Sequence, residues 1–362
     1  MLRNKWPTAN EEQSEPIDHN VDMIVNPQPP TPQADNMQSD QSPIRIALFG
    51  YGVVGQGFHK ALQTAGGNFE LRHIVVKSKE KERPLPQKWF GFSVADAFAA
   101  ADFDLVVEAT NHAEDGFEIV RTALSLGLPV VSASKKMLAT NLAELIGLAA
   151  EYDAPLRWEA AVGGAIPVIS ILTSYLQGQE VLSVQGILNG TSNYILTQTN
   201  AGHSYEAALA GAQANGFAET DPSSDVDGHD AAYKLCLLSY AAFGAIISPD
   251  DVKVQGIRGP VAEALRQEGR PGQKLKLIAK AYPTASGRIQ AEVAPAWLDA
   301  PDPLFGVDFE YNAISIESAY AGTITLTGRG AGAEPTGSAV LANVVELAHW
   351  LEAKWHREEQ EV

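Results

Sequence analysis

Cysteine is almost absent from this sequence of 362 residues, in which only Cys236 occurs. One cysteine can form neither an intramolecular disulfide nor a metal cluster of several cysteines. Basic residues are few, because 26 Lys and Arg stand against 44 Asp and Glu and leave a formal net charge of −18. Nucleic acids and anionic membranes attract clustered Lys and Arg, and a membrane span needs roughly 18 consecutive apolar residues, which this sequence lacks. The composition therefore indicates a globular cytoplasmic protein without nucleic-acid or membrane partners.

Residues 1–43 lack glycine and hold seven of the 21 prolines, and their two basic and seven acidic residues leave a charge of −5. Such a segment buries too little apolar surface to offset its chain entropy, so we predict a disordered tail over residues 1–43. Arg3 and Lys5 are not followed by an apolar segment, and a secretory signal is not expected.

After residue 43, apolar segments typical of strands alternate with helical patterns. We expect four strands at residues 44–49, 71–76, 104–109 and 129–133, and helices at 53–65 and 116–126. Asn141 is expected to cap a further helix that ends near Tyr152. Such an alternation predicts an α/β fold with a parallel sheet, here a Rossmann-type dinucleotide-binding domain over residues 44–157.

The second half has a different pattern, which predicts an α+β domain over residues 158–333. The expected strands cover residues 182–188, 274–282, 290–294, 313–318 and 323–327, with helices at 167–176, 205–215 and 231–243. A last helix over about 336–355 carries an apolar stripe and, within residues 334–356, is expected to complete the first domain.

A glycine-rich sequence, Gly50-Tyr51-Gly52-Val53-Val54-Gly55, lies directly after the first strand and opens the first helix. The first glycine permits a tight turn, the second lets a pyrophosphate approach the backbone, and the third allows close packing of helix on strand. A plain turn is the alternative, but the strand–turn–helix context favours a dinucleotide site. We therefore predict that Gly50, Gly52, Val53, Val54 and Gly55 bind a cofactor.

The second strand ends at Val76-Lys77-Ser78-Lys79 and carries no acid where NAD-binding sheets place one for the ribose 2′-hydroxyl. Lysines and a serine suit a 2′-phosphate better. The prediction is NADP, with Lys77 as a ligand and NAD as the second option. The alternative is that these lysines are ordinary solvated loop residues.

Two lysines are candidates for proton transfer. Lys135 follows a strand at the carboxyl edge of the predicted sheet, where catalytic groups of such folds lie. Lys234 stands four residues after Asp230, on the same face of a helix with almost no other polar side chain. An exposed ion pair is the alternative, but a buried lysine has a lowered pKa and can exchange a proton near neutrality.

Three further segments, residues 159–167, 189–194 and 328–336, are glycine-rich or polar and lie at element boundaries. None of them identifies an activity alone. Together and in this order, however, the motifs resemble the homoserine dehydrogenase family over about residues 44–355. The most specific match is Gly216-Phe217-Ala218-Glu219-Thr220-Asp221-Pro222, continued by Asp225, Gly228, Asp230 and Lys234.

The resemblance implies reversible oxidation of L-homoserine to L-aspartate 4-semialdehyde with NAD or NADP, a step in threonine, methionine and isoleucine biosynthesis. It implies a homodimer formed through the second domain, which would also bind the small-molecule substrate. By this resemblance, proton transfer is assigned to Lys234 and Lys135, and substrate binding to Glu219, Asp225 and Asp230. The nicotinamide side of the cofactor is assigned to Thr110, Lys135 and Gly332. A structural sodium ion is assigned to the backbone oxygens of Glu159, Val162, Gly164 and Ile166.

The sequence departs from the family pattern at two places. Ser134 stands before Lys135 where the family usually has Asn, so a hydrogen bond there is expected to differ. The ACT module that many relatives carry at the C-terminus is not expected here, and neither is feedback inhibition by threonine through it.

Two other functions stay open, and so does the choice between Lys234 and Lys135 as proton donor. An aspartate-semialdehyde dehydrogenase would need a catalytic cysteine, and Cys236 lies in the middle of a helix beside Lys234. A catalytically silent NADP-binding regulator would tolerate the loss of Asp230 and Lys234, which are both present.

Overall fold

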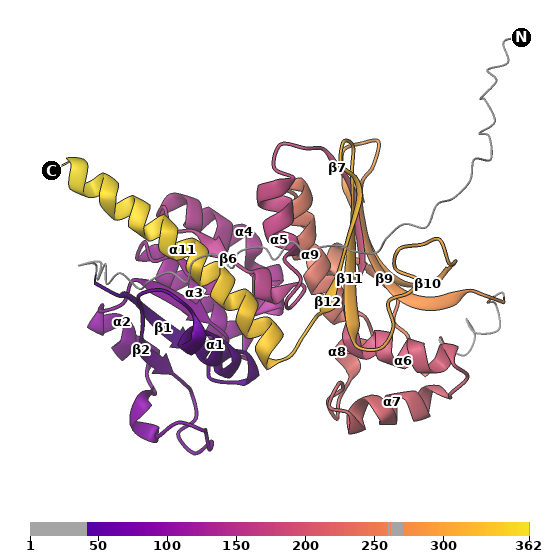
Figure 1. Ribbon diagram of the computed structural model, residues 1–362, viewed down its shortest axis with the longest axis horizontal. Coiled ribbons are helices and arrows are strands. Elements are labelled where there is room, and N and C mark those ends of the chain that lie inside the picture. Colours follow the sequence, from indigo (N-terminus) through magenta and orange to yellow (C-terminus); the bar gives the residue numbers. More distant parts are fainter. Residues whose placement is uncertain (1–41, 260, 262–268, 270, 362) are drawn as a thin grey trace, which may run out of the picture. The chain divides into compact units, whose positions relative to one another are not determined.

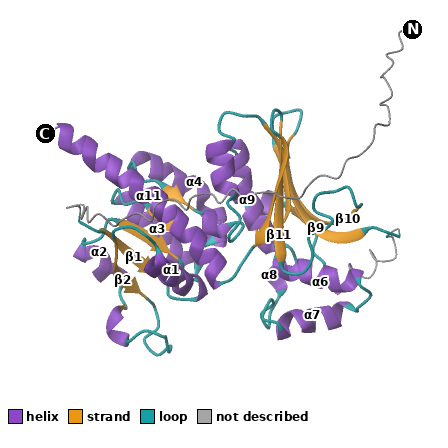
Figure 2. Ribbon diagram, viewed as in Figure 1, coloured by secondary structure: helices purple, strands orange, loops and turns teal. Residues whose placement is uncertain are grey.

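The part of the chain that the structure describes contains two sheets of six strands each. Figures 1 and 2 show the strands together with the helices that pack on them. The structure is a computed structural model that describes residues 42–361 except 260, 262–268 and 270. The tail predicted for residues 1–43 therefore lies, up to residue 41, outside the described residues. From Pro43 onward the chain forms one compact unit. Within the described residues, no helix is both long enough and apolar enough to cross a membrane.

The first sheet is parallel throughout, and its strand order β3-β2-β1-β4-β5-β6 is that of a doubly wound dinucleotide-binding fold. Its central strands are buried on both faces, which explains their continuous apolar sequences. All four predicted strands are confirmed, whereas β3 and β6 have two residues each and are too short to show a period. The strands are β1 (Ile44–Phe49), β2 (Phe69–Val75), β3 (Phe90–Gly91), β4 (Leu105–Glu108), β5 (Val130–Ser132) and β6 (Leu156–Arg157).

The connections of this sheet are helical: α1 (Val53–Thr64), η1 (Gln87–Trp89), α2 (Val94–Ala100), α3 (Ala113–Ser125) and α4 (Lys135–Glu151). The predicted helix that ends near Tyr152 is present as the part of α4 after a kink at Asn141, where two helical segments meet, and α4 as a whole begins earlier, at Lys135. Asn141 lies inside α4 with non-helical angles, φ −118° and ψ 16°. Its side-chain nitrogen donates 2.8 Å back to the carbonyl oxygen of Met137, a bond that bends a helix instead of starting one. Lys135 therefore lies at a helix N-terminus.

The second sheet has the order β12-β11-β7-β9-β10-β8 and is antiparallel except for the β10–β8 pair. Its strands are β7 (Val181–Ile187), β8 (Lys253–Val254), β9 (Lys274–Pro283), β10 (Ile289–Leu298), β11 (Tyr311–Ser318) and β12 (Gly322–Arg329). The five predicted strands are confirmed, and so is the combination of an α/β sheet with an α+β sheet.

The helical segments of this half are η2 (Glu159–Ala161), α5 (Val168–Ser170), η3 (Ile171–Tyr175), α6 (Gly190–Asn200), α7 (Tyr205–Ala214), α8 (Ser223–Val226), α9 (His229–Phe243) and η4 (Pro249–Asp251). The sequence analysis missed α6, whose polar residues show little helical periodicity. Asn189 caps it by accepting a hydrogen bond of 2.8 Å from the backbone nitrogen of Ser192.

The last helix, α11 (Ala333–Glu361), packs on α1, and Figure 1 shows the two segments side by side. Its predicted apolar stripe is buried, with Val340, Val344 and Leu347 fully inaccessible to solvent. The two helices touch through their backbones, because a Cβ atom added to Gly337 would lie 2.3 Å from the carbonyl carbon of Gly57. The helix α11 thus packs against α1, the helix that follows the glycine loop, although the two helices are far apart in the sequence.

Candidate active site

The carboxylate of Asp230, near the beginning of α9, joins two lysines from distant parts of the chain. Its Oδ2 lies 2.7 Å from Nζ of Lys234, and its Oδ1 lies 2.9 Å from Nζ of Lys135 at the start of α4. Nδ2 of Asn189 donates a third contact of 2.9 Å to Oδ2. Asp230 is only 4% exposed, so these contacts replace its lost hydration.

Lys234 is buried and points its ammonium group toward the end of β7. Its Nζ donates a hydrogen bond of 2.6 Å to the carbonyl oxygen of Leu188. Burial lowers the pKa of Lys234, and the negative charge of Asp230 opposes that shift only in part. Although burial by itself would raise the pKa of Asp230, the charges of Lys234 and Lys135 outweigh it and hold that pKa below its usual range. The pair therefore joins a carboxylate of lowered pKa to a buried lysine of lowered pKa.

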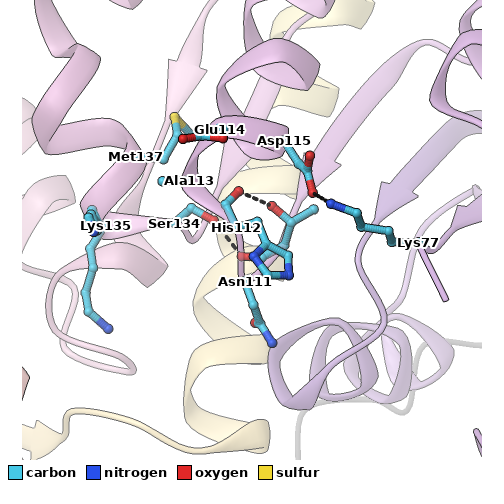
Figure 3. A pocket seen from close by; sticks show the side chains of 11 residues that line it. Lys77, Asn111, His112, Ala113, Glu114, Asp115, Ser134, Lys135 and Met137 are labelled. Atoms are coloured by element: carbon cyan, nitrogen blue, oxygen red, sulfur yellow. Dashed lines mark hydrogen bonds and ion pairs between the residues drawn. The ribbon is translucent and has the colours of Figure 1, made fainter. Parts of the chain in front are cut away.

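Lys135 differs from Lys234 in exposure and in the direction of its pKa shift. Its side chain is 42% exposed and helps to line a cavity of about 560 Å³, together with Thr110, Asn111 and Ser134 (Figure 3). The charge of Asp230 raises the pKa of Lys135 against the effect of burial. The two lysines on Asp230 therefore differ in the direction of their pKa shifts, which is downward for Lys234 and upward for Lys135.

Two further acids surround this pair. Asp225, in α8, accepts a hydrogen bond of 2.7 Å from Nδ2 of Asn189, and burial, reinforced by the charge of Asp230, raises its pKa. Glu219 is exposed in the loop before α8, and its charge also contributes to the raised pKa of Lys135. Asn189 connects Asp225 and Asp230 through its side-chain nitrogen. The sequence showed only that a polar residue stands here at the end of a strand, and did not reveal this connection.

The glycine loop has the geometry that a dinucleotide requires. Gly50 has φ +98°, and a Cβ atom there would lie 2.3 Å from the carbonyl oxygen of Ala109, so no other residue fits. A Cβ atom at Gly55 would be equally close to the carbonyl oxygen of Gly50. At Gly52, by contrast, the nearest such atom is Oδ1 of Asn111 at 3.9 Å, and the backbone is open to a ligand. Val53 and Val54 follow in the first turn of α1.

A second cavity, of about 460 Å³, extends from this loop and shares five lining residues with the first: Lys77, Thr110, Asn111, His112 and Asp115. Lys77 is exposed, and its Nζ lies 2.8 Å from a carboxylate oxygen of Asp115 in α3 (Figure 3). Ser78, Lys81 and Arg83 line the same cavity. The last two were missed, because they lie in a loop with no periodic pattern, whereas Lys79 instead lies over the ring of Phe92.

The residues assigned to a sodium ion lie in one tight segment after β6. Val162 donates its backbone N–H to the carbonyl oxygen of Glu159, and Ile166 accepts from the N–H of Val168 at 2.8 Å. Gly164 lies between them with φ +58°. Backbone carbonyls are hard oxygen ligands with a second lone pair, which suits a sodium ion. The described residues contain no group of three or more His, Cys, Asp or Glu side chains that could hold a metal.

Gly332 precedes α11 and accepts a hydrogen bond of 3.1 Å from the N–H of Thr336. It does not line either cavity, whereas Thr110 lines both.

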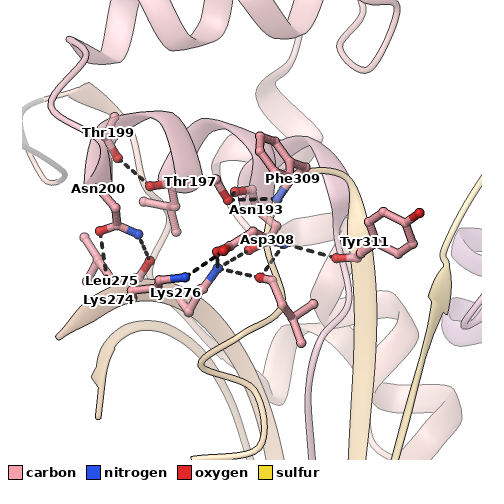
Figure 4. A network of polar contacts seen from close by, with 12 residues as sticks. Asn193, Thr197, Thr199, Asn200, Lys274, Leu275, Lys276, Asp308, Phe309 and Tyr311 are labelled. Carbon is pink, nitrogen blue, oxygen red and sulfur yellow. Dashed lines mark hydrogen bonds and ion pairs between the residues drawn. The ribbon is translucent and has the colours of Figure 1, made fainter. Parts of the chain in front are cut away.

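A second buried lysine, Lys276 in β9, was also missed by the sequence analysis (Figure 4). Its Nζ donates to Oδ1 of Asn193 at 3.1 Å, to the carbonyl oxygen of Val307, and to Oδ1 of Asp308 at 2.9 Å. Burial lowers the pKa of Lys276, and Asp308 opposes the shift. With three acceptors in place, this lysine ties the loop before β11 to α6 and serves structure instead of chemistry.

A parallel sheet of this order, with a glycine loop that opens onto a cavity adjoining the one that Lys135 lines, is typical of an NAD(P)-dependent oxidoreductase. The family model for the homoserine dehydrogenase NAD binding domain matches residues 50–159, and the model for homoserine dehydrogenase matches residues 167–345. The chain belongs to the homoserine dehydrogenase family, as the resemblance in its motifs implied.

Individual relatives agree with this assignment. The homoserine dehydrogenase of Corynebacterium glutamicum is 38% identical over 325 residues, which cover 85% of this chain and 72% of the relative. The solved homoserine dehydrogenase from Thiobacillus denitrificans is 31% identical with a TM-score of 0.82, and the match covers 86% of this chain and 74% of that one. A hyperthermophilic archaeal homoserine dehydrogenase solved in complex with NADPH is 25% identical with a TM-score of 0.70, covering 84% and 97%.

Proposed function

We propose that Lys234 takes up the hydroxyl proton of L-homoserine during its oxidation to L-aspartate 4-semialdehyde and returns it in the reverse reaction. The observation that carries this proposal is the buried contact of 2.7 Å between Lys234 and Asp230, in which burial lowers the pKa of the lysine. A general base must be largely deprotonated near the working pH, and burial favours the neutral amine. When bound, NAD(P) accepts a hydride from the substrate carbon in the oxidation and donates it in the reduction.

Lys135 has a complementary role in this proposal. Its raised pKa keeps a positive charge at the edge of the cavity, where it stabilises negative charge that develops on the substrate oxygen. Asp230 holds both ammonium groups in fixed positions, so one carboxylate sets the geometry of base and cation together.

Substrate selection is proposed to rest on the acidic side chains beside this pair. Within the described part of the chain, no ion pair involves Asp225 or Glu219, so both carboxylates are available for the ammonium group of the amino-acid substrate. Asp230 completes the acidic wall. Its own charge is already balanced by two lysines, which makes Asp225 and Glu219 the stronger partners.

NADP is the proposed cofactor. Its pyrophosphate would lie on the N–H groups at Gly52 and the start of α1, and its 2′-phosphate near Lys77, Lys81 and Arg83, which line one cavity. Because Asp115 holds Lys77 at 2.8 Å, the phosphate must compete with that carboxylate. The residues 44–157 together with 334–356 would form the cofactor domain, and residues 158–333 the substrate and dimerisation domain.

A sodium ion is proposed at the backbone oxygens of Glu159, Val162, Gly164 and Ile166, as the family resemblance implies. The protein is further proposed to act in the cytoplasm as a homodimer that forms through the second sheet. Phe309 and Tyr311, at the start of β11, are 49% and 39% exposed and would be covered by a second copy. Light scattering tests the dimer, and thermal denaturation in sodium chloride against choline chloride tests the ion.

The test of the whole proposal is oxidation of reduced cofactor by L-aspartate 4-semialdehyde, followed by the absorbance of the reduced nicotinamide. Turnover with NADPH that clearly exceeds turnover with NADH supports the reaction and the cofactor together. Faster turnover with NADH would keep the reaction and overturn the cofactor assignment. Cofactor binding without turnover in either case would overturn the proposed reaction.

A further inference from the structure

Glu108, the last residue of β4, carries a carboxylate that is completely buried. Among the described residues, none of the ion pairs includes it, so four hydrogen-bond donors compensate its charge. Oε1 accepts from the backbone nitrogen of Thr110 at 2.7 Å, from the hydroxyl of Thr110 at 2.6 Å and from the hydroxyl of Ser134 at 2.8 Å. Oε2 accepts from the hydroxyl of Ser132 at 2.5 Å.

This arrangement requires a carboxylate and not merely a polar side chain. An ionised carboxylate offers about four acceptor sites, whereas a glutamine has one acceptor oxygen and adds two donors that would face hydroxyl groups. Two helices also begin beside Glu108. The helix α4 begins directly after Ser134. The first turn of α3 is equally near, because a Cβ atom added to Gly116 would lie 3.0 Å from Oε1 of Glu108. The positive ends of helix dipoles favour a negative charge at such a place.

The contact with Ser134 connects this buried carboxylate to the candidate active site. The Ser134 hydroxyl also lies 3.0 Å from the carbonyl oxygen of Thr110, and it does not cap its own helix. Lys135 is the next residue (Figure 3), and its Nζ lies 2.9 Å from Oδ1 of Asp230. The Glu108 contacts therefore fix the backbone from which the Lys135 side chain leaves.

We propose that Glu108 is a positioning residue, which holds Ser134 and thereby aims Lys135 at Asp230. This inference rests on the proposed function, because it gives Lys135 a part in the reaction. Glu108 itself touches neither cavity and takes no part in proton transfer. It acts by keeping the ends of β4 and β5 and the beginning of α4 in one geometry, and small displacements of a catalytic group lower rates strongly.

The first test compares Glu108→Gln with Asp104→Asn as a matched control. Asp104 precedes the same strand at its opposite end, and its carboxylate binds Arg45 at 2.7 Å. We expect Glu108→Gln to lower kcat by about tenfold, and Asp104→Asn to leave kcat within about twofold at a similar loss of thermal stability. Equal loss of kcat in both variants, or no loss in Glu108→Gln, would show that Glu108 only supports the fold.

The second test is a double-mutant cycle with Lys135→Met. If Glu108 acts through Lys135, then Glu108→Gln lowers kcat by less than about twofold once Lys135 is already lost. Losses that multiply in the double variant overturn the inference while leaving the role of Lys135 intact. A Lys135→Met variant with full kcat removes the role of Lys135 and the inference with it.

Ser134→Ala provides a milder probe, because it removes the connection to α4 and leaves Glu108 three donors. It is expected to lower kcat in the same direction and to show the same dependence on Lys135. A readout besides turnover comes from NMR of lysines methylated with carbon-13, in which the Lys135 signal is assigned by its loss in Lys135→Met. The pKa of Lys135 should fall in Glu108→Gln and in Ser134→Ala but not in Asp104→Asn. An unchanged pKa in both would contradict the proposed positioning.

Discussion

Replacing Lys234 by methionine separates the chemistry of the candidate site from its contribution to stability. Methionine keeps most of the buried stem and removes the ammonium group, so packing in α9 is largely preserved. Asp230 then loses its contact of 2.7 Å but keeps Lys135 and Asn189, each at 2.9 Å. The carbonyl oxygen of Leu188 loses its donor.

The expected size of each effect follows from these contacts. Breaking a buried ion pair on one side costs about 3–5 kcal/mol, and the two remaining partners of Asp230 should reduce that to about 2–3 kcal/mol. A general base contributes about 10²- to 10⁴-fold to the rate, so kcat should fall by that factor. Lys234 lines neither cavity, and NADPH binding measured by fluorescence should change little.

The double variant Lys234→Met with Asp230→Asn makes the reasoning sharper. Removing the buried carboxylate, which by then has lost one of its two lysines, should restore about 1–2 kcal/mol of the free energy of unfolding without restoring kcat, because the base is still missing. Turnover and chemical denaturation are measured on the same preparations. A single variant that keeps kcat within tenfold of the native protein would refute the role of Lys234. A double variant less stable than Lys234→Met would refute the electrostatic argument.

Three further outcomes are expected. Because burial lowers the pKa of Lys234, kcat for homoserine oxidation should rise with pH and level off below pH about 10.4, the ordinary pKa of a lysine. The kcat for the reduction should fall over the same pH range. A midpoint of either pH profile at or above the ordinary lysine pKa would contradict this prediction. Lys77→Ala should raise KM for NADPH about three- to tenfold and leave KM for NADH unchanged. The effect on NADPH should be modest, because the ion pair with Asp115 already weakens the contact of Lys77 with the 2′-phosphate. Equal changes of both KM values would count against NADP as the cofactor. In thermal melts Gly337→Ala should destabilise the protein by about 2 kcal/mol or more, because the added Cβ atom clashes with α1. Gly147→Ala should stabilise the protein by about 0.5–1 kcal/mol, because a Cβ atom at this position of α4 meets open space. Stability changes of the same sign in both variants would contradict the packing of α11 on α1.

Local sequence patterns were sufficient for the elements that build the cofactor side of the fold. The apolar runs of β1, β4 and β5 and the glycine loop before α1 follow from short-range chemistry, because a strand buried on both faces must be apolar and Gly50 must adopt a positive φ. The contact between Asp230 and Lys234 could also be predicted from local sequence, because residues four apart lie on the same face of a helix.

Pattern reasoning failed where a contact overrides periodicity. Asn141 has the chemistry of a helix cap but bonds back to Met137 inside α4, and α6 forms from a polar segment that Asn189 caps. Lys276 alternates with apolar residues as an exposed strand residue would, yet Asn193 and Asp308 allow its complete burial. The partners of Lys276 come from other elements, so no local sequence pattern predicts its burial.

The sequence by itself determined the parallel sheet, the glycine loop and the contact between Asp230 and Lys234, because each depends on side chains close together in the chain. Only the tertiary structure decided that Lys135 also reaches Asp230, since Lys135 and Lys234 are separated by about a hundred residues and share Asp230 only after folding. The difference in their pKa shifts follows from solvent exposure, a property of the packed molecule. The same holds for Glu108, whose four donors converge only when the ends of β4 and β5 lie side by side.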